Sequence, residues 1–268
     1  MPIELLLALS GLAAGTFGAM LGLGGGILIV PILTLGFGVP LPSAIGTSLI
    51  CVIATSTGAA AINVRAGRAD VRLGVTLAAG TVVGAVTGGI IAGYLPERVL
   101  AGLFALLLGY TATTMLRGLL RPAVTLTASP ESDPAAPDGP DQPGYRTRRL
   151  SWGIGGSVLA GNVSGLLGVG GGIVTVPLIH LVMGAPLRVG VATSNFMIGI
   201  TAAAGSYAYL FRGDVDSRLA APVVLGVAAG AALGAILSGR LHARILGGIF
   251  VIVVGYVAVQ MALRAVGA

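Results

Sequence analysis

Long apolar runs separated by short polar breaks follow one another along most of the chain. A helix that crosses a bilayer needs about 20 mostly apolar residues, and most of the runs approach that length. Two runs are shorter, and an eleven-residue helix rises only about 16 Å, roughly half of the apolar core. We predict long segments near 3–21, 43–64, 73–94, 98–116, 150–167, 189–211, 219–240 and 244–263, and short ones near 27–37 and 173–183.

A different kind of sequence separates the first five segments from the last five. Between Pro122 and Tyr145 the chain is rich in Pro, Asp, Ser and Gly and has almost no large apolar side chain. Such a stretch cannot bury enough surface to offset its ordering entropy. We therefore predict a flexible linker over 122–147, either a simple tether or a regulatory loop. It joins a first membrane repeat, 1–121, to a second, 148–268.

The composition agrees with a membrane protein and excludes several other classes. Hydrophobic residues make up 55% of the chain and charged residues 9%, whereas a soluble domain has about 25% charged residues. The formal net charge is +6, but every basic residue is an Arg in a break between apolar runs, and no basic stripe with interleaved aromatics indicates nucleic-acid binding. We predict an all-α polytopic integral membrane protein with the lipid bilayer, and no nucleic acid, as partner.

Few residues could carry catalytic or metal chemistry. Cys51 is the single cysteine, which excludes an intrachain disulfide and a cysteine metal cluster. No predicted segment has Asp, Glu or Lys at its centre or a convincing catalytic dyad. We therefore predict no metal, no cofactor, no enzymatic activity and no proton relay through membrane carboxylates. The apolar N-terminal run lacks a basic region before it, so we expect a first membrane segment rather than a cleaved signal peptide.

The second half of the chain repeats the first at a constant offset. Leu21–Pro31 reads LGLGGGILIVP, and Leu167–Pro177, 146 residues further on, reads LGVGGGIVTVP. The register holds without a gap for about a hundred residues, which indicates an internal duplication. Further equivalent pairs are Pro40 and Pro186, Thr47–Ser48 and Thr193–Ser194, Gly84 and Gly230, Gly88 and Gly234, and Gly109–Tyr110 and Gly255–Tyr256.

The odd number of segments in each repeat predicts that the repeats are inverted relative to each other. With the linker inside, eleven Arg residues lie inside and four outside, and the positive-inside rule selects this orientation with both termini outside. Inverted repeats are typical of secondary transporters, whose sites lie near the midplane where discontinuous helices meet. The inside residues are Arg65, Arg68, Arg72, Arg117, Arg121, Arg146, Arg148, Arg149, Arg188, Arg240 and Arg244, and the outside ones are Arg98, Arg212, Arg218 and Arg264.

Two glycine clusters, one in each repeat, are the first candidates for a binding site. Each interrupts an apolar run, and non-helical backbone at membrane depth is tolerated only where protein buries it or it lines a wet cavity. A glycine turn that opens a helix presents free N–H groups and the positive end of the helix dipole, which favours an anion. Isolated glycines such as Gly84 and Gly88 are instead expected to allow close helix crossing. The candidate binding glycines are Gly24, Gly25, Gly26, Gly170, Gly171 and Gly172.

Polar side chains on the third segment of each repeat, 43–64 and 189–211, are the second group of candidates. Thr47, Cys51 and Thr55 are spaced i, i+4 and i+8 on one face, and hydroxyls and amides can bind sulfonate or carboxylate oxygens. Single Ser and Thr residues usually bond back to their own helix, whereas Asn195 is costlier to bury unpaired and is the stronger candidate. The candidate binding residues are Thr47, Ser48, Cys51, Thr193, Ser194 and Asn195, and those for access or gating are Thr16, Asn162, Pro31, Pro177 and Arg188.

The doubled GLGGGxxxVP pattern, the GVP and GAP turns and the following Thr-Ser pairs resemble the sulfite exporter TauE/SafE family of membrane permeases. The resemblance covers nearly all of the chain except the linker. It implies a bacterial inner-membrane permease for sulfite or an organosulfonate. It also implies that the site includes Gly24, Gly25, Gly26, Pro31, Thr47 and Ser48, with Gly170, Gly171, Gly172, Pro177, Thr193 and Ser194 opposite.

The leading hypothesis is a transporter of a small sulfur-containing anion that works by alternating access around the two glycine turns. An anion channel, in which the same dipoles form a filter, stays open as an alternative, as does a transporter of another small organic anion. A membrane scaffold would not need paired helix breaks. The sequence leaves the oligomeric state open, and a homo-oligomer is compatible with it.

Overall fold

A computed structural model describes residues 3–20, 25–120, 150–237 and 243–267. These residues form ten α-helices and two π-helical turns, and no strand occurs among them. The first repeat contains α1 (Ile3–Met20), α2 (Gly26–Pro31), η1 (Ile32–Gly36), α3 (Leu41–Arg65), α4 (Val71–Tyr94) and α5 (Glu97–Leu120). The second contains α6 (Leu150–Leu167), α7 (Gly172–Pro177), η2 (Leu178–Val182), α8 (Leu187–Phe211), α9 (Ser217–Leu237) and α10 (Ala243–Val266). The predicted linker lies outside the described residues.

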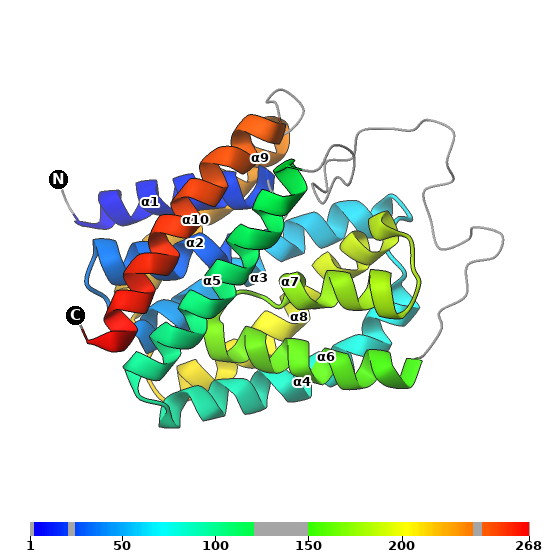
Figure 1. The fold of residues 1–268 in the computed structure, drawn as a ribbon, viewed down its shortest axis with the longest axis horizontal. Coiled ribbons are helices and arrows are strands. Elements are labelled where there is room, and N and C mark those ends of the chain that lie inside the picture. The colour runs from blue at the N-terminus through cyan, green and yellow to red at the C-terminus, as the bar shows by residue number, and fades with distance from the viewer. Residues whose placement is uncertain (1–2, 21–24, 121–149, 238–242, 268) are drawn as a thin grey trace.

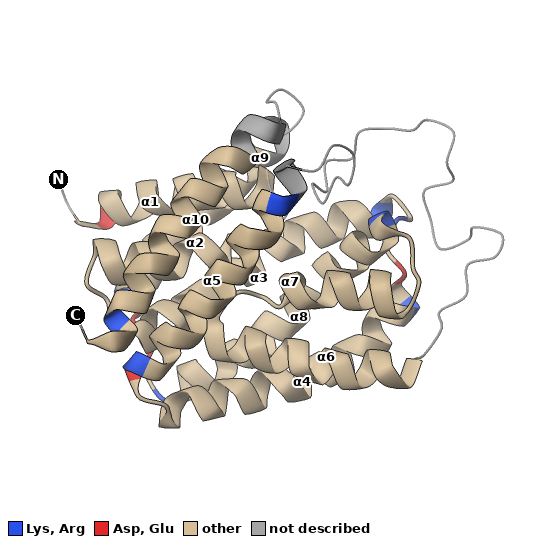
Figure 2. Ribbon diagram, viewed as in Figure 1, with Lys and Arg blue, Asp and Glu red and all other residues tan. Residues whose placement is uncertain are grey.

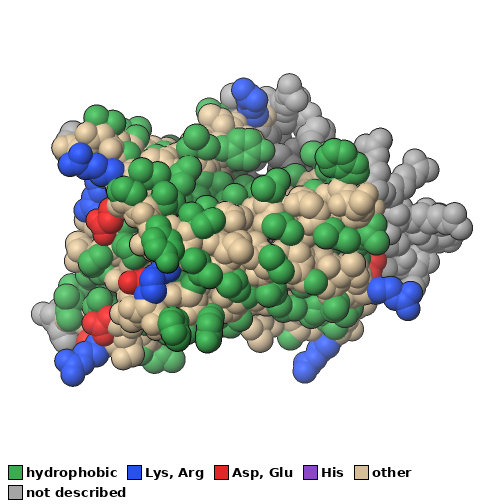
Figure 3. Space-filling model, turned by 90° about the horizontal axis from the view of Figure 1, so that it is seen from below, with side chains coloured by type: hydrophobic (Ala, Val, Ile, Leu, Met, Phe, Trp, Pro, Cys, Tyr) green, Lys and Arg blue, Asp and Glu red, His purple; other side chains and the backbone are tan. Residues whose placement is uncertain are grey.

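The long helices have the length and apolar surface of membrane spans. Seven helices in the described part of the chain are long and apolar enough to cross a bilayer. The charged residues lie near the ends of the helices (Figure 2), and hydrophobic side chains cover much of the surface between them (Figure 3). Because lipid replaces water around this middle zone, the exposed apolar side chains there are expected rather than costly. The prediction of an all-α polytopic membrane protein is confirmed.

The two short predicted segments are short helices in the structure. Gly25 and Gly171 precede α2 and α7 with φ angles of 75° and 76°, a left-handed conformation that glycine adopts without a steric penalty. Pro31 and Pro177 end the α-helical part, and η1 and η2 follow directly. Because proline has no N–H, it cannot continue the regular ladder, and the chain widens into a π-helical turn.

The first helix of each repeat packs against a helix of the other repeat, and we call α1 and α6 the exchanged helices. Helix α1 packs against α9 of the other repeat, and α6 packs in the same way against α4, while α3 packs against α8 and α5 against α10. In Figure 1, α1 begins at the edge where both chain ends lie, whereas α6 begins at the opposite edge. These antiparallel paths agree with inverted repeats, which stay a prediction, as do the cytoplasmic linker and the outside termini.

The isolated glycines lie where the exchanged helices touch. A Cβ added to Gly84 would meet the backbone of α6 at Val158, and one added to Gly230 would meet the backbone of α1 at Leu12. Gly88 and Gly234 make equivalent contacts one turn further along. The prediction that these residues allow close helix crossing is therefore confirmed, and backbone contact of this kind is a main source of packing energy between membrane helices.

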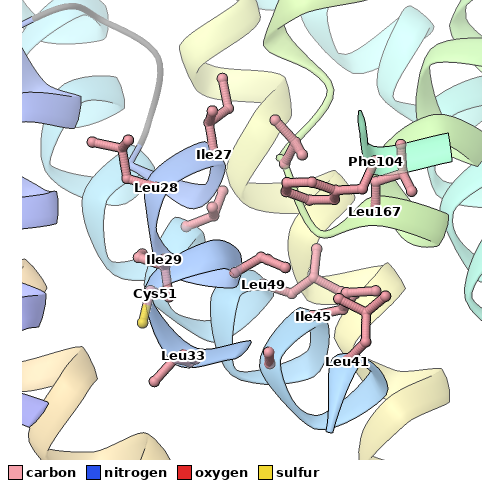
Figure 4. Close-up of a cluster of buried hydrophobic side chains, with 14 of the residues drawn as sticks. Ile27, Leu28, Ile29, Leu33, Leu41, Ile45, Leu49, Cys51, Phe104 and Leu167 are labelled. Atoms are coloured by element: carbon pink, nitrogen blue, oxygen red, sulfur yellow. The ribbon is translucent and has the colours of Figure 1, made fainter. Parts of the chain in front are cut away.

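A buried apolar cluster surrounds the first short helix and holds it in place (Figure 4). All six residues of α2 are buried, whereas most of α7 is half-buried. The first short helix is therefore fixed by apolar packing from several elements, and the second is more accessible. The labelled members of the cluster are Ile27, Leu28, Ile29, Leu33, Leu41, Ile45, Leu49, Cys51, Phe104 and Leu167.

Candidate functional site

The glycine turns of the two repeats meet in the interior. A Cβ added to Gly26 would lie 2.8 Å from the Gly168 carbonyl oxygen. Gly168, Gly170 and Gly171 all have positive φ angles, so three residues of the second turn adopt a conformation that other residues rarely adopt. The structure thus brings Gly26 and the second glycine cluster together, as predicted for helix breaks from opposite repeats. Gly24 lies outside the described residues.

Ser48 ties the two turns to each other. This fully buried residue of α3 donates hydrogen bonds to the carbonyl oxygen of Gly168, at 2.8 Å, and to that of Gly26, at 3.2 Å. One hydroxyl therefore contacts the turn of its own repeat and the turn of the other. Since a hydroxyl has one proton, these contacts share a single donor. Ser48 consequently serves as a link between the repeats.

Ser194, the equivalent residue in α8, makes a different contact. Its hydroxyl lies 2.6 Å from the hydroxyl of Thr175 in α7, and Thr175 in turn donates to the carbonyl oxygen of Gly171 at 3.1 Å. The first repeat has Ile29 at the position of Thr175, so Ser48 has no such neighbour. This difference in sequence explains why Ser194, unlike Ser48, has a hydroxyl partner in the short helix of its own repeat.

The start of each short helix presents backbone N–H groups. The first helical bonds are donated by Leu28 and Ile29 to the Gly25 carbonyl, and by Val174 and Thr175 to the Gly171 carbonyl. The N–H groups that precede them in each helix, at positions 26–27 and 172–173, have no carbonyl one turn earlier in the helix. They are donors at the positive end of a helix, the type of group that binds anion oxygens.

Ser164 adds an unpaired hydroxyl to the second turn. It is fully buried in α6, and its Oγ has no hydrogen-bond partner in the described part of the protein. A Cβ added to Gly171 would lie 3.7 Å from this Oγ, so the hydroxyl adjoins the turn. A buried polar atom without a partner is rare and often marks a place where water or a ligand binds. Repeat-based reasoning missed Ser164 because its equivalent in the first repeat is Gly18.

Asn195 is a second polar side chain with unused bonding capacity. It is half-buried beside Ser194 on α8, and its amide has no hydrogen-bond partner among the described residues. An amide of this kind can donate to one oxygen of a ligand while accepting from another group. Arg188 is exposed in the first turn of the same helix. The structure therefore keeps Asn195 as a candidate.

Other predicted residues lie away from the turns or are engaged elsewhere. The Thr193 hydroxyl accepts from the Asp70 N–H at 3.0 Å, next to the start of α4, and Cys51 belongs to the buried apolar cluster with Ile29 (Figure 4). Thr47 is buried, at 2% exposure. The structure does not bring Thr193 to the second turn, because the stripe on α8 that begins at Thr193 faces α4.

The access candidates of α1 and α6 contribute to helix packing. Thr16 donates to the carbonyl oxygen of Leu12 in its own helix at 2.7 Å. The Asn162 amide donates to the Thr87 hydroxyl of α4 at 3.2 Å. Both residues also lie on the glycine contacts between exchanged helices. These bonds have a structural role, and no described contact connects either side chain to the turns.

Two uncharged glycine turns at the junction of two helical repeats define a polytopic membrane protein of the transporter class, and the comparison with known proteins agrees. The chain belongs to the sulfite exporter TauE/SafE family, which it matches over residues 7–261. It is 30% identical over 249 residues to the probable membrane transporter protein YunE of Bacillus subtilis (strain 168), which covers 89% of this chain and 90% of that protein. The family resemblance in the sequence is thus confirmed.

Two further relatives carry the same description. The probable membrane transporter protein YdhB of Bacillus subtilis (strain 168) is 28% identical over 237 residues, 88% of this chain and 89% of that protein. A probable membrane transporter protein of Methanocaldococcus jannaschii is 28% identical over 211 residues, 76% of this chain and 72% of its own length. No solved structure matches the chain significantly. The protein is therefore a multi-pass membrane transporter of this family.

Proposed function

We propose that this transporter moves a small sulfur-containing anion, such as sulfite or an organosulfonate, across the cytoplasmic membrane. The observation that carries the proposal is the unpaired Ser164 hydroxyl at the second glycine turn. It adjoins a helix start whose N–H groups lack helical partners. The family description supports the sulfur chemistry of the substrate.

The groups around the second turn suit an anion with several oxygens. Backbone N–H groups and hydroxyls at this turn can each donate to one oxygen of a sulfite or sulfonate group, and the proposed site adds the amide of Asn195, the residue after Ser194 on α8. The neighbours of the turns identified above carry no formal charge, so binding relies on dipoles and hydrogen bonds. Such a site holds an anion without the strong charge pairing that would slow its release, which suits a transporter.

The way the repeats are joined supports a proposal of alternating access. Each repeat contributes one glycine turn, and the Ser48 hydroxyl contacts the Gly168 carbonyl across the junction. In the proposed cycle this junction rocks, so that the site opens to one side of the membrane at a time. The linker and most Arg residues lie on the cytoplasmic side in this proposal, with both termini outside. The tight burial of Ser48 and Ser194 favours an occluding site over an open anion channel.

Anion-dependent thermal stability of the purified protein tests the proposal. Sulfite, sulfate, thiosulfate, sulfoacetate, taurine, acetate and phosphate are added in turn, since a ligand that binds only the folded state raises its apparent stability. We expect a selective shift with one sulfur-containing anion. Ser164→Ala should weaken that anion's affinity about 10-fold, because a hydrogen bond to a charged group is lost, without lowering stability in the absence of anions.

Ser157→Ala is the matched control. Ser157 is also fully buried in α6, but its hydroxyl donates to the carbonyl oxygen of Ile154 at 2.7 Å. This variant should keep the anion response. Equal responses in both variants would remove Ser164 from the site, and no shift with any sulfur-containing anion would contradict the proposed substrate class. In liposomes, saturable uptake at a modest turnover distinguishes a transporter from a channel.

A further inference from the structure

Two aliphatic side chains fill the space between the glycine turns. Val52 lies one helical turn after Ser48 on α3, and Ile198 lies one turn after Ser194 on α8. They occupy equivalent positions in the two repeats, and their exposed fractions are 0% and 5%. Both therefore point into the junction, on the same helix faces as the two serines.

The contacts of Val52 reach the turns of both repeats. A Cβ added to Gly26 would lie 2.8 Å from Val52 Cγ2, and a Cβ added to Gly170 would lie 2.8 Å from Val52 Cγ1. Val52 thus touches its own turn and the opposite turn. The side chain occupies the space that a larger residue at either glycine would need.

Ile198 completes the contact from the other helix. A Cβ added to Gly170 would lie 2.9 Å from Ile198 Cγ2, and one added to Gly172 would lie 2.8 Å from Ile198 Cδ1. Gly170 is therefore held between the two aliphatic side chains. The second turn therefore packs against an apolar wall that consists of one side chain from each repeat.

We propose that Val52 and Ile198 form an apolar constriction that sets the size of the transported anion. This inference rests on the proposed function, because it assigns the substituent end of the anion to these side chains and the oxygens to the turns. Shape-based selection by aliphatic side chains is modest, since one methylene group changes discrimination by about 10-fold to 200-fold. Shortening either residue should admit larger organosulfonates.

Uptake of anions of graded size into liposomes tests the inference. Sulfite, methanesulfonate and toluenesulfonate are compared in the wild type, Val52→Ala and Ile198→Ala. We expect the ratio of toluenesulfonate to sulfite uptake to rise roughly 10-fold in each variant. Val227→Ala is the control, because Val227 is equally buried, at 0% exposure, but lies on α9 against Gly15. Ile198→Val, which removes a single carbon, is the milder variant if the larger deletions do not fold.

The outcomes separate this inference from the proposed function. Sulfite uptake with an unchanged size ratio in the Val52 and Ile198 variants, or an equal change in Val227→Ala, would overturn the constriction and leave the function standing. If the wild type carries none of the three anions, the proposed substrate class fails. Thiol labelling then tests whether Val52 and Ile198 line the transport path.

For the labelling, Val52→Cys, Ile198→Cys and Val227→Cys are each made in a Cys51→Ala parent and treated with a membrane-impermeant thiol reagent. Cysteines that line a transport path react when the site opens to water. Labelling at positions 52 and 198, but not at 227, would place the pair on the path of whatever solute the protein carries. The absence of labelling at both positions would overturn the inference.

Discussion

Apolar side chains surround the short helix that follows the first glycine turn, whereas several hydroxyls adjoin the second turn. The helix that follows the first turn is fully buried, and Ser48 links that turn to the other repeat. Around the second turn lie Thr175, Ser194 and the unpaired Ser164 hydroxyl. Two copies of one motif therefore differ in what surrounds them, and the difference suggests that one copy holds the repeats together while the other receives the ligand.

Three changes in sequence account for most of this difference. Ser164, Thr175 and Asn195 of the second repeat correspond to Gly18, Ile29 and Leu49 of the first. Each exchange replaces an apolar residue or glycine with a residue that can form hydrogen bonds. An inverted repeat needs similar backbones in its two halves, but it does not need equal side chains. We therefore expect the substrate to lie closer to the second glycine turn than to the first.

The largest loss of stability is expected where the exchanged helices touch, because these helix contacts hold both glycine turns in place. Gly84→Val would push its side chain into the α6 backbone at Val158. We expect a loss of 3 kcal/mol or more, about the upper end for overpacking, and hence little folded protein. Fluorescence-detected size exclusion would measure the folded yield. The control is Gly109→Val, which has no atom within 4 Å of the added Cβ and should express normally; equal yields would contradict the prediction.

Alanine substitutions in the two glycine turns should cause a smaller loss of stability, and the loss should differ between the turns. Gly25→Ala introduces a side chain at a φ of 75° with its nearest neighbour 3.6 Å away, so we expect a loss of about 1–2 kcal/mol from the left-handed conformation alone. Gly170→Ala adds the close contacts with Val52 and Ile198, which should cost about 1–3 kcal/mol more. Thermal unfolding in detergent would measure both. Adding Val52→Ala should restore part of the loss in Gly170→Ala but none in Gly25→Ala.

Ser48 and Ser194 should differ in how much each contributes to stability. Ser48→Ala removes a donor from the carbonyl oxygens of Gly26 and Gly168, and we expect a loss of about 1–3 kcal/mol because these buried acceptors lose a partner. Ser194→Ala leaves Thr175 bonded to Gly171 and should cost about 0.5–1.5 kcal/mol. Chemical denaturation in detergent would rank them. Ser56→Ala is the control, because the Ser56 hydroxyl donates to the Ile53 carbonyl oxygen of its own helix. A larger loss for Ser194→Ala than for Ser48→Ala would reverse the assigned roles.

The length of the apolar runs and the internal repeat were sufficient to predict nearly every helix, including the short ones. Apolar length determines membrane spans, and the Gly and Pro residues around α2 and α7 mark where the helix must break. The contacts between repeats could not be predicted in this way, because they depend on how distant helices pack. Val52 and Ile198 carry no chemical signal in a sequence that is 55% hydrophobic. Ser164 was not predicted because the equivalent position in the first repeat is Gly18.

The smallest effect on stability is expected at Asn195, where the effect on binding should be large. Its amide has no described hydrogen-bond partner and is half-buried, so Asn195→Leu, which copies Leu49 of the first repeat, should change the free energy of unfolding by no more than about 0.5 kcal/mol. If the amide donates to the anion, the same variant should weaken anion binding about 10-fold or more. Calorimetric titration together with thermal unfolding measures both quantities in one preparation.

Asn63→Ala is the matched control for that experiment, since the Asn63 amide donates to the carbonyl oxygen of Ala59 at the far end of α3. It should lose some stability and keep its anion affinity, the reverse of the Asn195 variant. Stability and binding would then change independently at the two asparagines. If Asn195→Leu instead lowered stability and left affinity unchanged, the amide would have a structural role, and the proposed polar ligands would reduce to Ser164, Thr175 and Ser194.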